Sequence, residues 1–178
     1  MKPDSLTIRS SINHNLYKKT LFRGSFLSFL GFLPLLYGSL WMDAATLSVW
    51  GIPLFIVGMG LIMWGMLPFK RIKELERDPN ELHWIDNHSI SYDHKGKKTM
   101  TIPINSIENL TYLEGDTIYG IKLTFKKNMD QKVTVHDPRF AYERYEKESQ
   151  KRYGCDLFFP YFSKRSYSKF QPVSNHAS

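Results

Sequence analysis

The sequence lacks a second cysteine, so Cys155 cannot form an intramolecular disulfide. This is consistent with a reducing cytoplasm. The chain also lacks a glycine-rich phosphate loop, a nucleophile elbow and a Ser/His/Asp arrangement. His83, His88 and His94 are not accompanied by the cysteine or carboxylate spacing of a metal site. We therefore expect no catalytic centre, no metal site and no other cofactor.

Charge is nearly absent from two apolar runs, residues 22–41 and 49–69, where Arg23 is the single charged residue. About 20 residues at a rise of about 1.5 Å cross a hydrocarbon core of about 30 Å. The first run is longer than a signal-peptide core and a second run follows at once, so we interpret it as a retained anchor. Buried core helices are the alternative, but little polar chain remains to surround them. The runs predict a transmembrane hairpin with its juxtamembrane extension at residues 22–77, preceded by a cytoplasmic arm at 1–21.

The connection between the runs, residues 42–48, contains Asp43 and neither Lys nor Arg. Basic residues lie instead around the opposite ends of the two runs, at Lys18, Lys19, Arg23, Lys70, Arg71, Lys73 and Arg77. Positively charged flanks stay in the cytoplasm. The pattern predicts a multi-pass protein of the bacterial cytoplasmic (inner) membrane with both termini inside.

Glycine recurs every seven residues in both apolar runs, which places each set near one helical face. The six positions are Gly24, Gly31, Gly38, Gly51, Gly58 and Gly65. Helices associate in lipid by close van der Waals approach, which small residues permit. We expect the two glycine stripes to face each other in the hairpin. Dimerisation of two chains through one stripe is the alternative.

The second helix is predicted to continue to Arg77 and to end before Asp78-Pro79. Apolar residues then alternate with polar ones in six short segments, near residues 82–86, 90–92, 99–104, 107–113, 118–125 and 133–135. The turns between them include residues 87–88 and 126–130. A helix is expected from Asp137-Pro138, with Gly154 as its C-terminal cap. The fold class is thus a membrane helical hairpin plus an α+β, mostly antiparallel soluble domain at 78–154.

This order resembles that of the bacterial pleckstrin-homology-like membrane proteins. The similar stretches are residues 82–92, residues 101–108 with their Ile-Pro strand end, residues 116–125 and residues 137–153. The resemblance spans about residues 22–153 and implies a small β-sandwich or barrel closed by a C-terminal helix. A full domain of that family has seven strands, whereas six are predicted here.

The net charge of +7 is unevenly placed, because residues 78–150 carry more acidic than basic side chains. The positive excess beside the spans and in the tail suits anionic lipid headgroups better than nucleic acid, and no nucleic-acid partner is expected. The candidate headgroup contacts are Lys70, Arg71, Lys73, Lys95, Lys97, Lys98, Lys164, Arg165 and Lys169. Solvated loops are the alternative for the lysines at 95–98.

The tail at 155–178 mixes aromatic with basic residues. It could be an interfacial lid or docking peptide, a stacking surface for single-stranded nucleic acid, or an added strand packed on the domain. The leading hypothesis for the whole chain is a non-catalytic membrane protein whose β-rich domain is an interaction or assembly platform for an unidentified protein. An alternative is a hairpin protein resembling the inclusion-membrane proteins of intracellular bacteria, with both termini in the host cytosol. An enzyme is the least favoured class.

Overall fold

The computed structural model describes residues 5–85, 88–126 and 133–174. The chain divides into two compact units. The helical unit is His14–Glu74, and the β unit combines Met1–Asn13 with Leu75–Ser178. The turns predicted at residues 87–88 and 126–130 lie largely outside the described residues.

The helical unit contains two long helices, α1 (His14–Trp41) and α2 (Ala44–Arg77). Both are long and apolar enough, by length and composition, to cross a membrane. The break between them falls at Met42 and Asp43. The prediction that the second helix ends just before Asp78-Pro79 is confirmed, since α2 ends at Arg77.

The larger sheet of the β unit is antiparallel throughout, with strand order β1-β2-β3-β4-β7. Its strands are β1 (Ser5–Arg9), β2 (Glu81–Ile85), β3 (Ser89–His94), β4 (Lys97–Pro103) and β7 (Thr134–Val135). Leu82 and Trp84 alternate with more exposed neighbours in β2, as a strand with one buried face requires. The period-two segments of the sequence therefore mark strands here.

A short 3-10 turn, η1 (Ile104–Ser106), leads from β4 into the smaller sheet. That sheet is also antiparallel, in the order β5-β6-β8. Its strands are β5 (Ile107–Leu113), β6 (Gly120–Phe125) and β8 (Leu157–Pro160). The two sheets are not closed into a barrel. Their apolar side chains share one core, in which the Tyr92 and Phe159 rings lie 4.8 Å apart.

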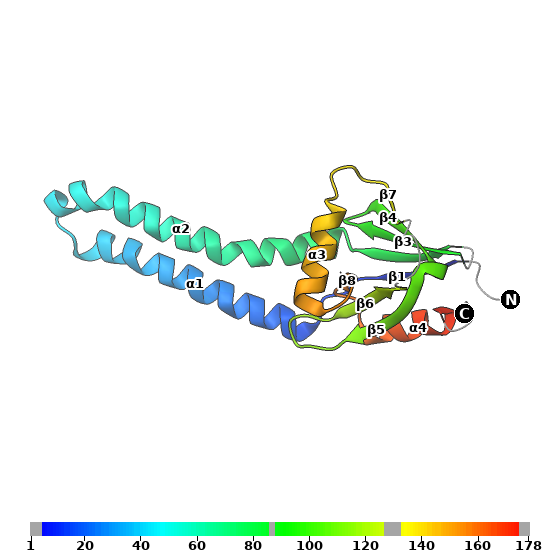
Figure 1. The fold of residues 1–178 in the computed structure, drawn as a ribbon. Coiled ribbons are helices and arrows are strands. Elements are labelled where there is room, and N and C mark those ends of the chain that lie inside the picture. Colours follow the sequence, from blue (N-terminus) through cyan, green and yellow to red (C-terminus); the bar gives the residue numbers. More distant parts are fainter. Residues whose placement is uncertain (1–4, 86–87, 127–132, 175–178) are drawn as a thin grey trace. The chain divides into compact units, whose positions relative to one another are not determined.

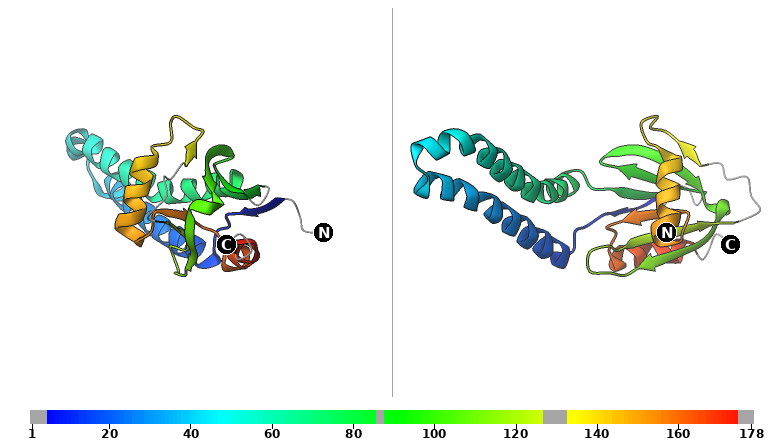
Figure 2. Two further views of the ribbon diagram at one scale, coloured as in Figure 1. Left: turned by 45° about the vertical axis from the view of Figure 1, so that its right-hand side comes forward. Right: turned by 60° about the vertical axis from the view of Figure 1, so that its left-hand side comes forward.

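Two helices, α3 (Tyr142–Tyr153) and α4 (Lys164–Ser174), flank the sheets (Figures 1 and 2). α3 packs on β8, and α4 contacts both β1 and β5. Side chains on these helices satisfy backbone groups at the outer strands. The Ser149 Oγ accepts from the Phe158 N–H, and the Tyr145 hydroxyl donates to the Phe158 carbonyl. Covering edge strands in this way prevents them from pairing with another chain.

Both ends of the chain contribute more to the β unit than the sequence suggested. The N-terminal arm, for which no strand was predicted, supplies β1. The tail supplies β8 and α4, so the added strand is the alternative that the structure shows. Phe159, Phe162 and Phe170 are each at most 1% exposed, which leaves them unable to form an interfacial lid in this conformation.

The helix expected from Asp137-Pro138 begins later, at Tyr142, and that prediction is wrong. Asp137 instead forms a turn, in which its carboxylate accepts from the Arg139 N–H at 2.9 Å. A side chain that bonds its own local backbone competes with helix formation. The predicted C-terminal cap is confirmed, since Gly154 is left-handed with φ of 64° and donates to the Gln150 carbonyl.

Candidate functional site

Glycine residues bring the backbones of α1 and α2 into contact. A Cβ atom built on Gly24 would lie 2.6 Å from the Gly65 carbonyl oxygen, and one on Gly65 would lie 2.6 Å from that of Gly24. Seven residues further along α1, a Cβ on Gly31 would lie 2.6 Å from the Gly58 carbonyl oxygen. No side chain can occupy such a gap without separating the helices. Four of the six predicted glycines therefore face each other.

The other two predicted glycines have roomier surroundings. A Cβ on Gly38 would meet Leu54 and Leu47 at ordinary contact distances of 3.6 and 3.7 Å. A Cβ on Gly51 would meet Leu47 of its own helix at 3.6 Å. The requirement for glycine is thus greatest at two contacts between the helices, Gly24 with Gly65 and Gly31 with Gly58.

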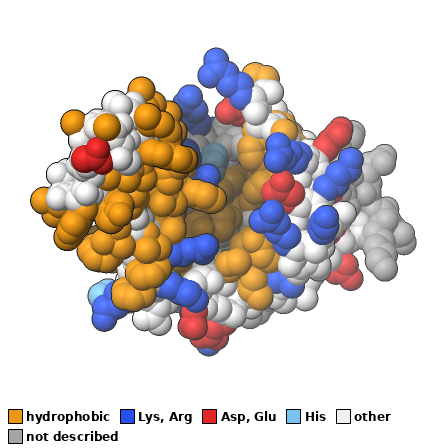
Figure 3. Space-filling view, turned by 90° about the vertical axis from the view of Figure 1, so that its left-hand side faces the viewer, with side chains coloured by type: hydrophobic (Ala, Val, Ile, Leu, Met, Phe, Trp, Pro, Cys, Tyr) orange, Lys and Arg blue, Asp and Glu red, His pale blue; other side chains and the backbone are white. Residues whose placement is uncertain are grey.

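The remaining surface of α1 and α2 is apolar and exposed (Figure 3). Phe22 is 77% exposed, Ile52 72% and Trp41 71%. Soluble monomers rarely expose a contiguous apolar patch larger than a few hundred Å². The helix pair is therefore a surface that requires an apolar environment or a covering partner.

Aromatic and basic side chains meet where α1 begins and the apolar part of α2 ends. The Tyr17 and Phe69 rings lie 6.4 Å apart, and the Lys73 Nζ lies 5.7 Å from the Phe69 ring centre. The exposed Lys70 and Arg71 follow directly. Amphipathic rings and long cationic side chains are typical of the boundary between lipid and water.

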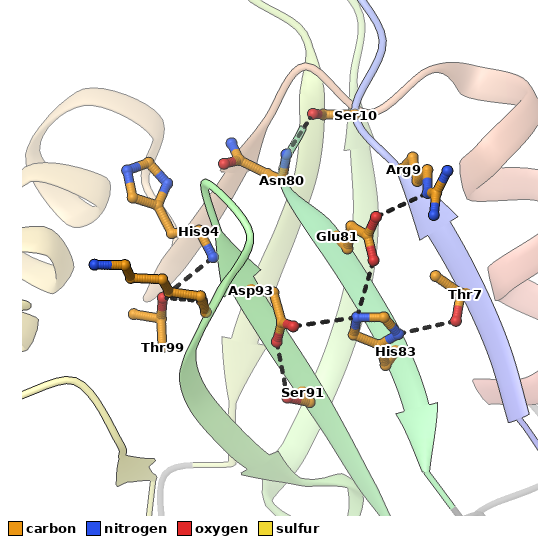
Figure 4. A network of polar contacts seen from close by, with 11 residues as sticks. Thr7, Arg9, Ser10, Asn80, Glu81, His83, Ser91, Asp93, His94 and Thr99 are labelled. Carbon is orange, nitrogen blue, oxygen red and sulfur yellow. Dashed lines mark hydrogen bonds and ion pairs between the residues drawn. The ribbon is translucent and has the colours of Figure 1, made fainter. Parts of the chain in front are cut away.

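A ladder of polar side chains crosses β1, β2 and β3 on the face of the large sheet opposite the core (Figure 4). Its centre is His83, whose Nε2 lies 3.3 Å from a Glu81 carboxylate oxygen and 3.4 Å from one of Asp93. The His83 Nδ1 lies 2.9 Å from the Thr7 hydroxyl. Arg9 pairs with Glu81 at 2.8 Å. Such cross-strand pairs tie the N-terminal strand to its neighbours.

In the part of the chain that the structure describes, no group of three His, Cys, Asp or Glu side chains is arranged to hold a metal ion. His83 belongs to the ladder, and the ring of His94 lies beside that of Tyr92 at the end of β3, 6.2 Å away. His83 and His94 therefore have different side-chain partners.

Tyr92 of β3 lies in the core of the β unit, and Tyr145 of α3 packs against that core. Burial raises the pKa of Tyr92 and that of Tyr145 well above the ordinary value of 10.0, so both hydroxyls stay protonated. Tyr145 donates to the Phe158 carbonyl. Every buried side-chain nitrogen or oxygen in the described part of the chain has a hydrogen-bond partner. These groups satisfy one another within the core, as a structural network does.

The predicted headgroup contacts lie on three separate elements. Lys70, Arg71 and Lys73 are exposed near the end of α2, and Lys95, Lys97 and Lys98 are exposed on the β3–β4 hairpin. On α4, Lys164 pairs with Glu114 at 2.8 Å, which partly neutralises it, while Arg165 and Lys169 are exposed.

Comparison of the chain with protein-family models, curated proteins and solved structures gave no match.

Proposed function

We propose that this chain is an integral membrane protein whose α1 and α2 cross the bilayer as a hairpin. In this proposal the β unit is a non-catalytic platform for interaction or assembly on the cytoplasmic side. The observation that carries the proposal is the exposed apolar surface of both helices, from Phe22 at 77% exposed to Ile52 at 72%. At about 25 cal/mol per Å² of apolar area, leaving such a surface in water is costly.

The pairing of β1 with β2 supports a hairpin with both ends on one side of the membrane. β1 precedes α1 and β2 follows α2, yet the two strands pair from Ser5↔Ile85 to Arg9↔Glu81. Two strands on opposite sides of a bilayer could not pair in this way. The cytoplasmic assignment of that side rests on the basic residues around the ends of the helices and on their absence from the connection at residues 42–48.

A relationship to the pleckstrin-homology-like domains is part of the proposal, and the layered antiparallel sheets with a helix after β7 support it. The β unit also differs from the expected pattern. It takes one strand from before the first span, and it adds β8 and a second helix after α3.

The polar ladder is the best candidate for the platform surface. It concentrates two acidic groups, an arginine and a histidine on one sheet face, with the side chain of Thr7 exposed beside them. The exposed basic side chains of the β3–β4 hairpin are proposed to meet anionic lipid, each contributing about 1 kcal/mol near the surface.

Topology reporters in the full-length protein test the membrane part of the proposal. A reporter active only in the cytoplasm should work after Ser178 and before Met1 and should fail when inserted at Ala44. Cytoplasmic activity at Ala44, or release of the protein by alkaline carbonate, would contradict the hairpin.

Photo-crosslinking in cells tests the platform. A crosslinking residue at Thr7, on the ladder face, should give a discrete protein adduct that Glu81→Gln weakens. The same residue at the exposed Arg144 on α3 serves as the matched control. Equal adducts at both positions would oppose a role for the ladder face.

A further inference from the structure

The two places where the chain passes between the helices and the β unit are joined to each other. Residues 10–13 connect β1 to α1, and residues 78–80 connect α2 to β2. The Ser10 N–H donates to the Asn80 carbonyl at 2.8 Å, and the Asn80 N–H donates to the Ser10 hydroxyl at 2.9 Å (Figure 4). Both residues are buried, and the Asn80 side-chain oxygen also accepts from the Lys95 N–H.

Tyr119 also bonds to the connection between β1 and α1. Its hydroxyl donates to the Ser11 carbonyl and accepts from the Asn13 N–H, both at 2.6 Å. Tyr119 is 4% exposed, and its ring packs edge-on against Tyr161 at 5.8 Å. The Ser11 N–H in turn donates to the Tyr161 carbonyl at 2.7 Å. Three segments distant in sequence therefore bind the four residues that precede α1.

A connection at the protein surface does not need this many hydrogen bonds to the folded unit. Backbone groups of a short polar linker are readily satisfied by water, and linkers without internal contacts are flexible. Here Ser10, Asn80 and Tyr119 are themselves buried, so breaking one of their bonds leaves a desolvated group without a partner, at a cost of about 1–3 kcal/mol. The connection is therefore an integral part of the β unit.

We propose that Ser10, Asn80 and Tyr119 form a clamp that fixes the spacing of α1 and α2 where α1 begins. The residues entering α1 are held beside those leaving α2, so the two helices cannot separate at this end while the clamp is closed. This inference goes beyond the proposed platform function, because it applies whether or not the β unit binds a partner.

Charge explains why this end of the helix pair needs a clamp. Lys18, Lys19 and Arg23 of α1 and Lys70, Arg71 and Lys73 of α2 flank the point where Tyr17 contacts Phe69. Like charges at this end repel, by roughly 1 kcal/mol for a pair at about 4 Å in water. The close Gly24–Gly65 contact lies nearest to these charges and tolerates no separation. The clamp opposes the repulsion, whereas the other end is closed by the short connection at Met42-Asp43.

Distance measurements between spin labels in the full chain test the clamp. In a Cys155→Ala background, one pair of labels is placed at Phe22→Cys and Met66→Cys, near the clamped end. A second pair, at Leu40→Cys and Ile52→Cys, lies near the closed end. All four positions are at least 60% exposed. The protein is reconstituted in bilayers of neutral and anionic phospholipid.

With Tyr119→Phe or Ser10→Ala, the distribution for Phe22/Met66 should broaden towards longer distances, while that for Leu40/Ile52 stays unchanged. Tyr142→Phe, which removes a half-buried hydroxyl on α3, is the matched control and should change neither. An unchanged Phe22/Met66 distribution in both clamp variants would overturn the proposal, because glycine packing alone would then hold the helices.

Amide hydrogen exchange provides a second measurement, made first on the native chain. The Ser11 and Asn13 amides of the native chain should exchange slowly, like those of strands β1 and β2. In Tyr119→Phe the Asn13 amide should lose its protection while β2 keeps its own. Exchange of Ser11 and Asn13 at the rate of an exposed loop in the native chain would also overturn the clamp.

Discussion

Lys95 has a backbone conformation that does not suit its residue type. It is the first of the two residues that connect β3 to β4, with φ of 52°, and Gly96 follows with φ of 71°. Two left-handed residues give a hairpin turn whose twist matches its strands, and Asn-Gly is the favoured pair. For a residue with a larger side chain this conformation costs roughly 1–2 kcal/mol. The hairpin thus carries a positive charge where Asn would fit better.

Replacing Lys95 with Asn should stabilise the β unit by about 1 kcal/mol, because Asn tolerates the left-handed region. The bond from the residue 95 N–H to Asn80 is kept. If the β3–β4 hairpin contacts anionic lipid, Lys95→Asn should also weaken binding of the protein to anionic vesicles. Chemical denaturation of the full chain in detergent and vesicle binding give the two readouts. Lys97→Asn removes the same charge from a strand position and should weaken lipid binding without stabilising; equal stabilisation by both variants would contradict the turn argument.

The thiol of Cys155 should report on the folding of the β unit. It is 4% exposed, and burial raises its pKa above the ordinary value of 9.0. A raised pKa lowers the thiolate fraction at neutral pH, and only the thiolate is nucleophilic. We expect a maleimide reagent at pH 7.5 to leave the folded protein unmodified and to react rapidly once denaturant unfolds it. Rapid reaction of the native protein would show that this part of the unit opens readily.

At the scale of elements, the helix pair and the β unit are held together by different forces. The helices meet backbone to backbone at Gly24–Gly65 and Gly31–Gly58. In the proposed bilayer setting, close van der Waals approach would stabilise this contact more than apolar burial. The strands instead bury alternating apolar faces in a shared core. The outer strands of the small sheet are covered by helices, since Tyr167 donates to the Leu110 carbonyl of β5 as Tyr145 does to β8.

Gly31→Ala should destabilise the helix pair, whereas Gly60→Ala should not. A Cβ on Gly31 would lie 2.6 Å from the Gly58 carbonyl oxygen and 2.9 Å from the Ile62 nitrogen, both backbone atoms. Overpacking of this kind costs about 1–3 kcal/mol. A Cβ on Gly60 meets nothing within 4 Å. Thermal melts in detergent, with proteolysis at the connection of the helices, compare the two. Equal melting temperatures for the two variants would mean that the helices do not pack through this stripe.

At the scale of the whole molecule, the first and last segments of the chain complete one unit. Both long helices lie between β1 and β2 in the sequence, yet these two strands pair with each other. Helix α4, which follows β8, contacts β1. The turn after β8 also binds the connection to α1, through the Tyr161 carbonyl. The β unit therefore completes its packing only after α4 has been synthesised, and in the proposed membrane hairpin β1 must remain on the same side as β2 until then.

Truncation after Gly154 should prevent cooperative folding of the β unit. It removes β8 and α4 with Leu157, Phe159, Phe162 and Phe170, each at most 1% exposed. Fully burying one such side chain stabilises by about 1.5–3 kcal/mol, while whole domains are stable by only about 5–15 kcal/mol. Circular dichroism and limited proteolysis of the protein in detergent should show the loss. The control replaces Lys164, Arg165 and Lys169 with Ser, which keeps the buried side chains and should leave the melting transition cooperative. A cooperative transition in the truncated chain would contradict the role of the tail.

Local patterns in the sequence were sufficient wherever a segment carries its own signal. The two long apolar runs correspond to α1 and α2, because about 20 consecutive apolar residues is the length typical of a membrane-spanning helix. The six alternating segments correspond to β2 to β7, since period-two burial and turn residues are read within a few positions. Gly154 ends α3 because it alone adopts the left-handed conformation there without strain.

Only the tertiary structure decided the parts that depend on distant partners. Strand β1 has just Leu6 and Ile8 as apolar residues within its bounds and becomes a strand by pairing with β2. Strand β8 shows no alternation because Leu157, Phe158 and Phe159 are all buried. Phe158 packs against Tyr153 of α3, whereas Leu157 and Phe159 lie in the core. The Ser10–Asn80 and Tyr119 bonds join residues 70 and more than 100 positions apart. Sequence periodicity extends over one element, so contacts between elements have no periodic signal, and these segments acquire their structure from the partners that folding brings beside them.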